Sequence, residues 1–178
     1  LYLGRISPIK KIEHLLQAAE LLDRRQQDFI VTIVGSPMAG EDWEYERALK
    51  DRAAYLVKKG KVRFMPGLPN SETPAMYNQH EVFINLTPEG SFDKTVLEAM
   101  ACETLVLVSN RSFKDLVPEG FIFEPGNPKD LADKLCTLFK LSHQAKEQHG
   151  KNLRQEVVDR HSLDRLAKQL KSILSSNV

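Results

Sequence analysis

The stretch Phe29-Ile30-Val31-Thr32-Ile33-Val34-Gly35 decides the fold class of this chain. It is a continuous run of apolar and β-branched residues closed by a glycine, a pattern typical of a strand buried on both faces. Residues 11–25 before it repeat apolar side chains at helical spacing, and a second helix is expected at 42–58 after it. A buried strand between two helices predicts a parallel sheet that is covered by helices.

The same alternation continues along the rest of the chain. Further strands are expected at residues 1–3, 62–65, 82–86, 104–109 and 121–123, and further helices at 71–79, 94–102, 128–140, 143–160 and 162–175. We therefore predict one α/β domain, a doubly wound parallel sheet with helices on both faces. In such sheets ligands bind outside the carboxyl ends of the strands, where the strand order reverses.

Composition and charge exclude several classes of protein. The 178 residues are 42% hydrophobic and 28% charged, as in a globular domain, and 25 lysines and arginines nearly balance 24 aspartates and glutamates. No global positive field is therefore expected to recruit nucleic acid. Cys102 and Cys136 lie in apolar segments and are expected to be reduced core residues. The chain starts inside an apolar strand without a methionine, so we expect an excised fragment of a longer protein.

The first candidate loop is Gly4-Arg5-Ile6-Ser7-Pro8-Ile9-Lys10-Lys11. It places an arginine and two lysines beside the start of a helix, where the helix dipole disfavours cations unless an anion lies between them. A phosphate site explains this arrangement, and solvated charges on an ordinary turn explain it as well.

The second candidate loop is residues 87–94, which leads into the helix expected at 94–102. Ser91 or Asp93 is expected to be its N-cap, and Lys94 and Thr95 lie in its first turn, where backbone N–H groups bind anions. Glu98 follows one turn later beside apolar residues, so it needs either solvent or a polar partner. These features alone indicate a phosphate-containing ligand without identifying it.

Several other motifs are missing from the sequence. There is no G-x-G-x-x-G dinucleotide fingerprint and no Walker P-loop. The histidines show no metal-ligand spacing; they are His14, His80, His143, His149 and His161. We therefore expect neither a nicotinamide cofactor nor a metal site.

Two motifs resemble those of the family 4 (group 1) glycosyltransferases. Residues 4–10 resemble the G-R-x-x-x-x-K loop of that family, and Val96-Leu97-Glu98-Ala99-Met100-Ala101-Cys102 matches its V-L-E-A-M-A-C helix. The resemblance covers essentially the whole chain. It implies one Rossmann-like half of a GT-B fold, with residues 1–178 as the C-terminal domain that binds the nucleotide-sugar donor, and with the N-terminal acceptor domain absent from this chain.

The resemblance also implies a role for each functional residue. Arg5 and Lys10 would neutralise the donor diphosphate and stabilise it as the leaving group. Glu98 would accept hydrogen bonds from the ribose hydroxyls. Backbone atoms would supply the remaining contacts, those of Lys94, Thr95 and Val96 to the phosphate and those near Gly67 and Leu68 to the base.

One position departs from the family motif where the donor sugar is expected. The first acid of the family falls at Gly90 here, and Glu89 lies one residue too early. Either Glu89 bulges into the site, or a variant loop brings Ser91 or Asp93 to the sugar. We favour the variant loop, which includes Phe92 in the donor site, because the ungapped match around this residue is good.

Two further positions differ from the family pattern. Lys11 and Glu103 stand where the family has glycine. Both changes are interpreted as compatible with the protein surface.

The resemblance implies a retaining, metal-independent glycosyltransferase that uses a nucleotide diphosphate sugar and no cofactor. Its partners would be that donor, the N-terminal domain of the same protein and a saccharide or lipid-linked acceptor, but no nucleic acid. Because the acceptor domain is absent, the chain alone is expected to be inactive. The family implies a cytoplasmic enzyme of polysaccharide assembly, peripheral at the inner face of the membrane.

Two alternatives stay open. A nucleotide-sugar epimerase shares the two-domain architecture and the phosphate chemistry but needs no acceptor. A degenerate binding module would have lost its donor affinity, and the missing acid at Gly90 is the feature that favours it. Arg5, Lys10 and Glu98 favour an active donor site instead.

Overall fold

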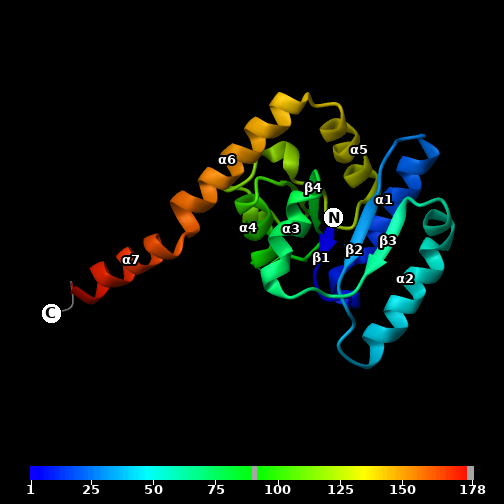
Figure 1. Cartoon of the computed structure of the whole chain (residues 1–178), viewed down its shortest axis with the longest axis horizontal. Helices are drawn as coiled ribbons and strands as arrows, with labels where there is room; N and C mark the ends of the chain where they lie inside the picture. The colour runs from blue at the N-terminus through cyan, green and yellow to red at the C-terminus, as the bar shows by residue number, and fades with distance from the viewer. Residues whose placement is uncertain (90–91, 176–178) are drawn as a thin grey trace.

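The protein is described by a computed structural model over residues 1–89 and 92–175 (Figure 1). The strands are β1 (Tyr2–Leu3), β2 (Val31–Val34), β3 (Val62–Met65), β4 (Val82–Asn85) and β5 (Leu105–Val108). The α-helices are α1 (Ile12–Arg24), α2 (Gly40–Lys58), α3 (Thr73–Asn78), α4 (Lys94–Ala101), α5 (Pro128–Phe139), α6 (His143–His161) and α7 (Leu163–Ser175). The α/β class predicted from the sequence is confirmed, and so is the order of helices and strands apart from the last predicted strand.

Backbone hydrogen bonds join the strands into a three-stranded and a two-stranded parallel sheet, which lie edge to edge. β1 pairs with β2, β2 with β3, and β4 with β5, each in parallel. The Ile84 N–H donates to the Leu1 carbonyl oxygen at 2.8 Å, which links β4 to β1. The strand order is therefore β3-β2-β1-β4-β5. It reverses between β1 and β4, which is where a doubly wound sheet binds its ligands.

Helices cover both faces of this sheet (Figure 1). α1 packs against α2 and α5, while α4 packs against α3 and α6. Right-handed crossovers explain the grouping, because α1 and α2 follow successive strands on one side of β1 and α4 follows a strand on the other side. The prediction of a doubly wound sheet with two helical layers is confirmed.

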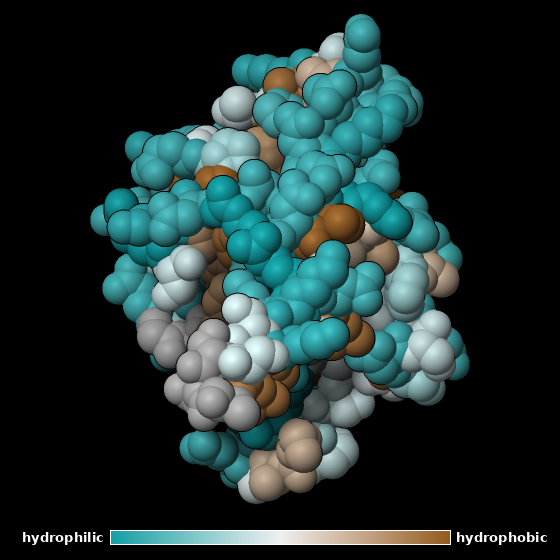
Figure 2. Space-filling view, turned by 90° about the vertical axis from the view of Figure 1, so that its left-hand side faces the viewer, coloured by the Kyte–Doolittle hydropathy of each residue, from teal (hydrophilic) through white to brown (hydrophobic). Residues whose placement is uncertain are grey.

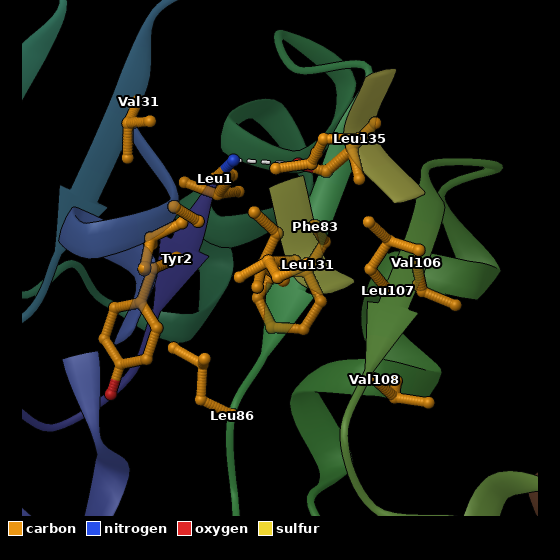
Figure 3. Packing of buried hydrophobic residues seen from close by; sticks show 14 of the residues in the cluster. Leu1, Tyr2, Val31, Phe83, Leu86, Val106, Leu107, Val108, Leu131 and Leu135 are labelled. Atoms are coloured by element: carbon orange, nitrogen blue, oxygen red, sulfur yellow. Dashed lines mark hydrogen bonds between the residues drawn. The ribbon is translucent and has the colours of Figure 1, made fainter. Parts of the chain in front are cut away.

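The hydrophobic core lies between the sheet and these helices. Every residue of β2, β4 and β5 is buried, which explains why these strands are nearly continuous apolar runs. Figure 3 shows Leu131 and Leu135 of α5 close to Phe83 of β4. The core therefore holds β1 and β4 firmly in place below the point where the strand order reverses.

The last predicted strand is wrong in its extent. Residues 119–121 form a 3-10 turn instead of a strand, and Ile122 makes one isolated parallel bridge to Val108. The Phe123 N–H donates to the Val108 carbonyl at 2.9 Å. Pro118 and Gly120 favour a turn at this point, so few residues are left for pairing with β5.

The C-terminal helix α7 stands away from the body of the molecule (Figure 1). Ser162 has extended backbone angles and separates it from α6. No described residue of α7 is buried, and its apolar side chains include Leu163, which is 83% exposed. Figure 2 views this side of the molecule, where apolar side chains lie scattered among hydrophilic ones. Within the described ranges, no helix is long and apolar enough to cross a membrane.

Candidate functional site

The loops after β1 and β4 meet where the strand order reverses. Lys10, from the loop after β1, lies with its ammonium nitrogen 2.9 Å from Asp93 Oδ2 and 3.1 Å from Thr87 Oγ1 in the loop after β4. Lys10 and Asp93 are largely buried, with side chains 22% and 15% exposed. Sequence analysis singled out both loops, and the structure brings them together.

Asp93 is the centre of a network of hydrogen bonds. Its Oδ1 atom accepts from the Thr95 backbone N–H at 3.2 Å and from the Thr95 hydroxyl at 2.7 Å, which confirms Asp93 as the N-cap of α4. Its Oδ2 atom accepts from Lys10, from the Thr87 hydroxyl at 2.9 Å and from the Asn85 amide at 3.1 Å. Both oxygens are therefore fully occupied by donors of the chain itself.

The charge of Asp93 is stabilised by these donors. Burial alone would raise the pKa of the carboxyl group, but the hydrogen bonds from Lys10, Thr95 and Thr87 outweigh it and lower the pKa to about 2. Asp93 is thus ionised at neutral pH and compensates the charge of Lys10. A contact from Asp93 to a sugar hydroxyl stays a prediction, and its occupied oxygens argue against it. Gly90 and Ser91 lie outside the described residues.

Arg5 differs from Lys10 in its surroundings. Its side chain is exposed, and no ion pair to it occurs among the described residues. It lies directly after β1 in a loop held by two backbone hydrogen bonds, from Gly4 N–H to Val34 O at 3.0 Å and from Ile6 N–H to Ser36 O at 3.2 Å. Of these two cations, Arg5 is therefore available to a ligand, whereas Lys10 is already paired with Asp93.

Gly35 allows the ends of β1 and β2 to come together. A Cβ atom at this position would collide with the backbone carbonyl of Gly4. Its own N–H donates to the Met65 carbonyl at 3.0 Å, so β3 is held at the same point. The glycine after β2, which the sequence showed only as the end of a buried strand, fixes the base of the Arg5 loop.

The loop after β3 is attached to the same region. The Gly67 N–H donates to the Ser36 hydroxyl oxygen at 3.0 Å. Gly67 is exposed and Leu68 is half-buried. Because the Gly67 N–H is already bonded, only the carbonyl group of Gly67 could form a backbone hydrogen bond with a base. Base binding by Gly67 and Leu68 stays a prediction.

Two backbone N–H groups in the first turn of α4 are already bonded to the N-cap residue Asp93. The Thr95 N–H donates to the Asp93 side chain, and the Val96 N–H donates to the Asp93 carbonyl at 3.2 Å. Lys94 is exposed at the first position of the helix. A phosphate that uses the predicted amides of residues 95 and 96 would have to displace this cap.

Glu98 is half-buried on α4, one turn after Lys94. Its Oε2 atom accepts a hydrogen bond from the Tyr77 hydroxyl at 3.1 Å. The sequence required a polar partner or solvent for Glu98, and the structure supplies Tyr77. This partner was missed because it lies on α3, 21 residues away along the chain, in a segment for which the sequence predicted only a helix.

Phe92 connects the loop after β4 to the end of α6. Its ring stacks on Phe113, with centroids 4.9 Å apart and an interplanar angle of 22°, and lies 5.6 Å from the His161 ring. It is 48% exposed. The ring is therefore engaged by the chain itself, and its predicted place in the donor site stays a prediction.

The two residues that replace a glycine of the family motif adopt a left-handed backbone conformation. Lys11 has a φ of 51° and Glu103 a φ of 62°, in the left-handed region that favours glycine. Both side chains are exposed, so the interpretation as surface positions is confirmed. The replacement nevertheless strains the backbone, which the sequence interpretation overlooked.

Other parts of the molecule are weaker candidates for a functional site. A cavity of about 490 Å³ lies at the amino ends of the strands, where Leu1, Arg63, His80 and Phe139 contribute to its lining. This is the opposite end of the sheet from Arg5 and Lys10.

Over residues 1–89 and 92–175, no cluster of histidine, cysteine, aspartate and glutamate has the arrangement of a metal site. Cys102 and Cys136 are free thiols, each half-buried rather than fully in the core.

Comparison with known proteins identifies the family. The profile described as "Glycosyl transferases group 1" matches residues 1–156. The chain belongs to the group 1 glycosyltransferases. It is 33% identical over 151 residues to a D-inositol 3-phosphate glycosyltransferase of Frankia alni, covering 80% of this chain and 37% of the relative. It is 26% identical to spore coat protein SA of Bacillus subtilis, covering 99% of this chain and 48% of the relative.

Solved structures show the same fold for this group 1 glycosyltransferase chain. The crystal structure of Anabaena Alr3699/HepE in complex with UDP superposes with a TM-score of 0.85 at 21% identity, covering 98% of this chain and 48% of that one. The C-terminal domain of a group 1 glycosyl transferase from Francisella tularensis superposes with a TM-score of 0.78 at 18% identity, covering 91% and 85%. The chain thus spans about half the length, or less, of the curated relatives it matches.

Proposed function

We propose that residues 1–178 are the C-terminal, donor-binding domain of a retaining, metal-independent glycosyltransferase. The enzyme would transfer a hexosyl group from a nucleotide diphosphate sugar to a saccharide or lipid-linked acceptor in the cytoplasm. The observation that carries this proposal is that Arg5, which is exposed and has no ion pair among the described residues, shares the loop after β1 with Lys10, whose ammonium is held in the loop after β4 where the strand order reverses. Family membership and the UDP bound by the Anabaena neighbour support it.

Charge development explains why two cations would be placed there. When the bond between the sugar and the diphosphate breaks, the departing diphosphate gains negative charge, and fixed cations stabilise it. Arg5 can approach the phosphates without losing an ion pair. Lys10 is held by Asp93 and Thr87, so it would contribute a positioned proton donor whose charge is partly compensated.

Glu98 and the loop after β3 would bind the nucleoside. A carboxylate can accept from both hydroxyls of a ribose, and Glu98 lies half-buried near the start of α4. The exposed backbone of Gly67 and the half-buried Leu68 would contact the base. The identity of the base would then depend on the carbonyl groups of this loop.

The exposed apolar face of α7 is assigned to the N-terminal domain of the same protein. Four leucines form this face, namely Leu163, Leu166, Leu170 and Leu174, and each is at least half exposed. Their spacing of three and four residues places these side chains on one face of the helix, and an exposed apolar face of this kind favours an interaction surface. The acceptor and the groups that orient it would come from that domain, so the chain alone would bind donor without transferring sugar.

One observation favours a second candidate, a binding module without catalytic activity. The family's first acid is replaced by Gly90, and the oxygens of the nearby Asp93 are occupied by donors of the chain. No acidic side chain among the described residues of this loop is then available for a donor sugar except Glu89. Loss of sugar recognition with retention of nucleotide binding would be the signature of this candidate.

The proposed function is tested by isothermal titration of the chain with UDP, GDP and ADP in the presence of a chelator. Saturable binding of one nucleotide is expected, weakened at least about tenfold by Arg5→Ala and by Glu98→Ala. Arg47→Ala removes an exposed arginine of α2 and serves as the matched control. Absence of binding at millimolar nucleotide by the folded chain, or an equal effect of Arg47→Ala, would contradict the proposal.

A further inference from the structure

Tyr77 is a rigidly held residue of α3 whose side chain is fully buried. Its ring packs edge-to-face on Phe83 of β4, with centroids 5.5 Å apart and an interplanar angle of 83°. The Thr104 hydroxyl donates to the Tyr77 carbonyl at 3.1 Å. Tyrosine has few rotatable bonds, so these contacts leave its hydroxyl in one place.

That hydroxyl reaches Glu98 and donates to its Oε2 atom at 3.1 Å. Burial, together with the charge of Glu98, raises the pKa of the Tyr77 phenol. The phenol is therefore protonated at neutral pH and acts as the donor. No other hydrogen bond to the Glu98 carboxylate is found in the described part of the chain, so Oε1 is open to a ligand.

A glutamate without such a partner is a poor receptor for a diol. Its side chain samples several rotamers in solution, and a ligand that binds it must restrict this freedom. The Tyr77 hydroxyl restricts it before the ligand arrives. It also uses one lone pair of Oε2, which leaves the other lone pairs of the carboxylate for two hydroxyl groups.

We propose that Tyr77 is a positioning residue that orients Glu98 toward a ribose diol and so selects ligands carrying both ribose hydroxyls. This inference rests on the proposed function, in which Glu98 binds the ribose. Tyr77 acts through Glu98, and the burial of its side chain keeps it out of contact with the nucleotide.

The test compares two ligands on the same protein. Wild type and Tyr77→Phe are titrated with the nucleoside diphosphate that binds most tightly among UDP, GDP and ADP, and with the 2′,3′-dideoxy analogue of the same nucleotide. Tyr77→Phe is expected to weaken the natural nucleotide about 3- to 10-fold and to leave the analogue within about 2-fold of wild type. Because both ligands report on the same folded fraction, a loss of stability in the variant does not alter this comparison.

Two further variants distinguish a failure of the proposed role of Tyr77 from a failure of the proposed function. Tyr55→Phe removes the hydroxyl of an exposed tyrosine on α2 and should leave both affinities unchanged. In a Glu98→Ala background, Tyr77→Phe should have no further effect on the natural nucleotide. Equal losses for both ligands, or no loss for either, would overturn the role of Tyr77 while leaving that of Glu98 intact. If Glu98→Ala itself leaves the natural nucleotide unaffected, the proposed function fails instead.

Discussion

Two sides of the candidate site are held together by different means. On the β1–β3 side, which comprises residues 4–11, 35–36 and 66–68, backbone groups meet directly, and Gly35 leaves room for the carbonyl of Gly4. On the β4–α4 side, residues 85–95, the side chains of Asn85, Thr87 and Asp93 hold the loop through hydrogen bonds. The β1–β3 side should therefore be sensitive to added volume, and the β4–α4 side to lost polarity or charge.

Gly35→Ala is the substitution on the β1–β3 side that should destabilise the protein most. The added methyl group would overlap the Gly4 carbonyl, so the free energy of unfolding should fall by about 3 kcal/mol or more. Gly40→Ala is the matched control, because a Cβ atom there meets nothing within 4 Å, and its effect should stay within about 1 kcal/mol. Urea denaturation measures both. Similar values for the two variants would mean that the strand ends tolerate side chains.

Asp93→Asn tests the charge on the β4–α4 side. The pKa of Asp93 is lowered from 3.8 to about 2 in the folded protein, so its ionised form stabilises the fold above pH 4 by about 2 kcal/mol. This contribution is lost as the pH falls through about 2. The stability difference between wild type and Asp93→Asn should therefore shrink as the pH is lowered from 5 toward 2. Asp51→Asn, at an exposed position of α2, should show no such trend.

A pair of hydroxyl deletions compares the two sides directly. Thr87→Val removes one hydrogen bond each from Lys10, Asn85 and Asp93 and should cost about 2 kcal/mol. The Ser7 hydroxyl on the β1–β3 side is buried without a hydrogen-bond partner among the described residues. Ser7→Ala should therefore change stability by less than about 1 kcal/mol, toward higher stability. Thermal unfolding of the two variants decides the comparison, and equal losses would show that both sides rely on side chains.

Lys11→Gly and Glu103→Gly give the smallest expected effects. Both residues occupy left-handed backbone conformations, Lys11 on the β1–β3 side and Glu103 beyond the C-terminal end of α4, so glycine should stabilise each by about 0.5–1 kcal/mol. Arg47→Gly, within α2, should cost about 1 kcal/mol by contrast. A loss of stability at residue 11 or 103 would indicate that the lysine or glutamate side chain contributes more than the backbone strain removes.

The sequence predicted the fold well because apolar periodicity is a local signal. The apolar run at residues 29–34 and the helical spacing around it were sufficient to place the sheet and its covering layers. The segment at 121–123 was misassigned because a single bridge to Val108 carries no periodic signal. β2 is also shorter than predicted, since Ile30 is exposed and precedes the paired residues.

The candidate site was predictable only in its local parts. Asp93 as N-cap follows from residues next to one another, whereas its pairing with Lys10 joins positions 83 residues apart. The Tyr77–Glu98 bond likewise spans 21 residues, and nothing in the spacing of α3 distinguishes this tyrosine from a core residue. The backbone strain at Lys11 and Glu103 could have been predicted, because a glycine in the family motif can indicate a left-handed backbone conformation as well as a need for a small side chain.

The exposure of α7 has a consequence for amide hydrogen exchange. A helix of 13 residues without a buried side chain is marginal in water, since most helical stability in proteins comes from packing. Its amide protons should exchange with solvent far faster than those of α4, where Val96, Ala99 and Met100 are buried. Slow exchange in α7 would appear only when its apolar face is covered. The exchange rate of this one helix therefore reports how much of the protein population has its apolar face occupied.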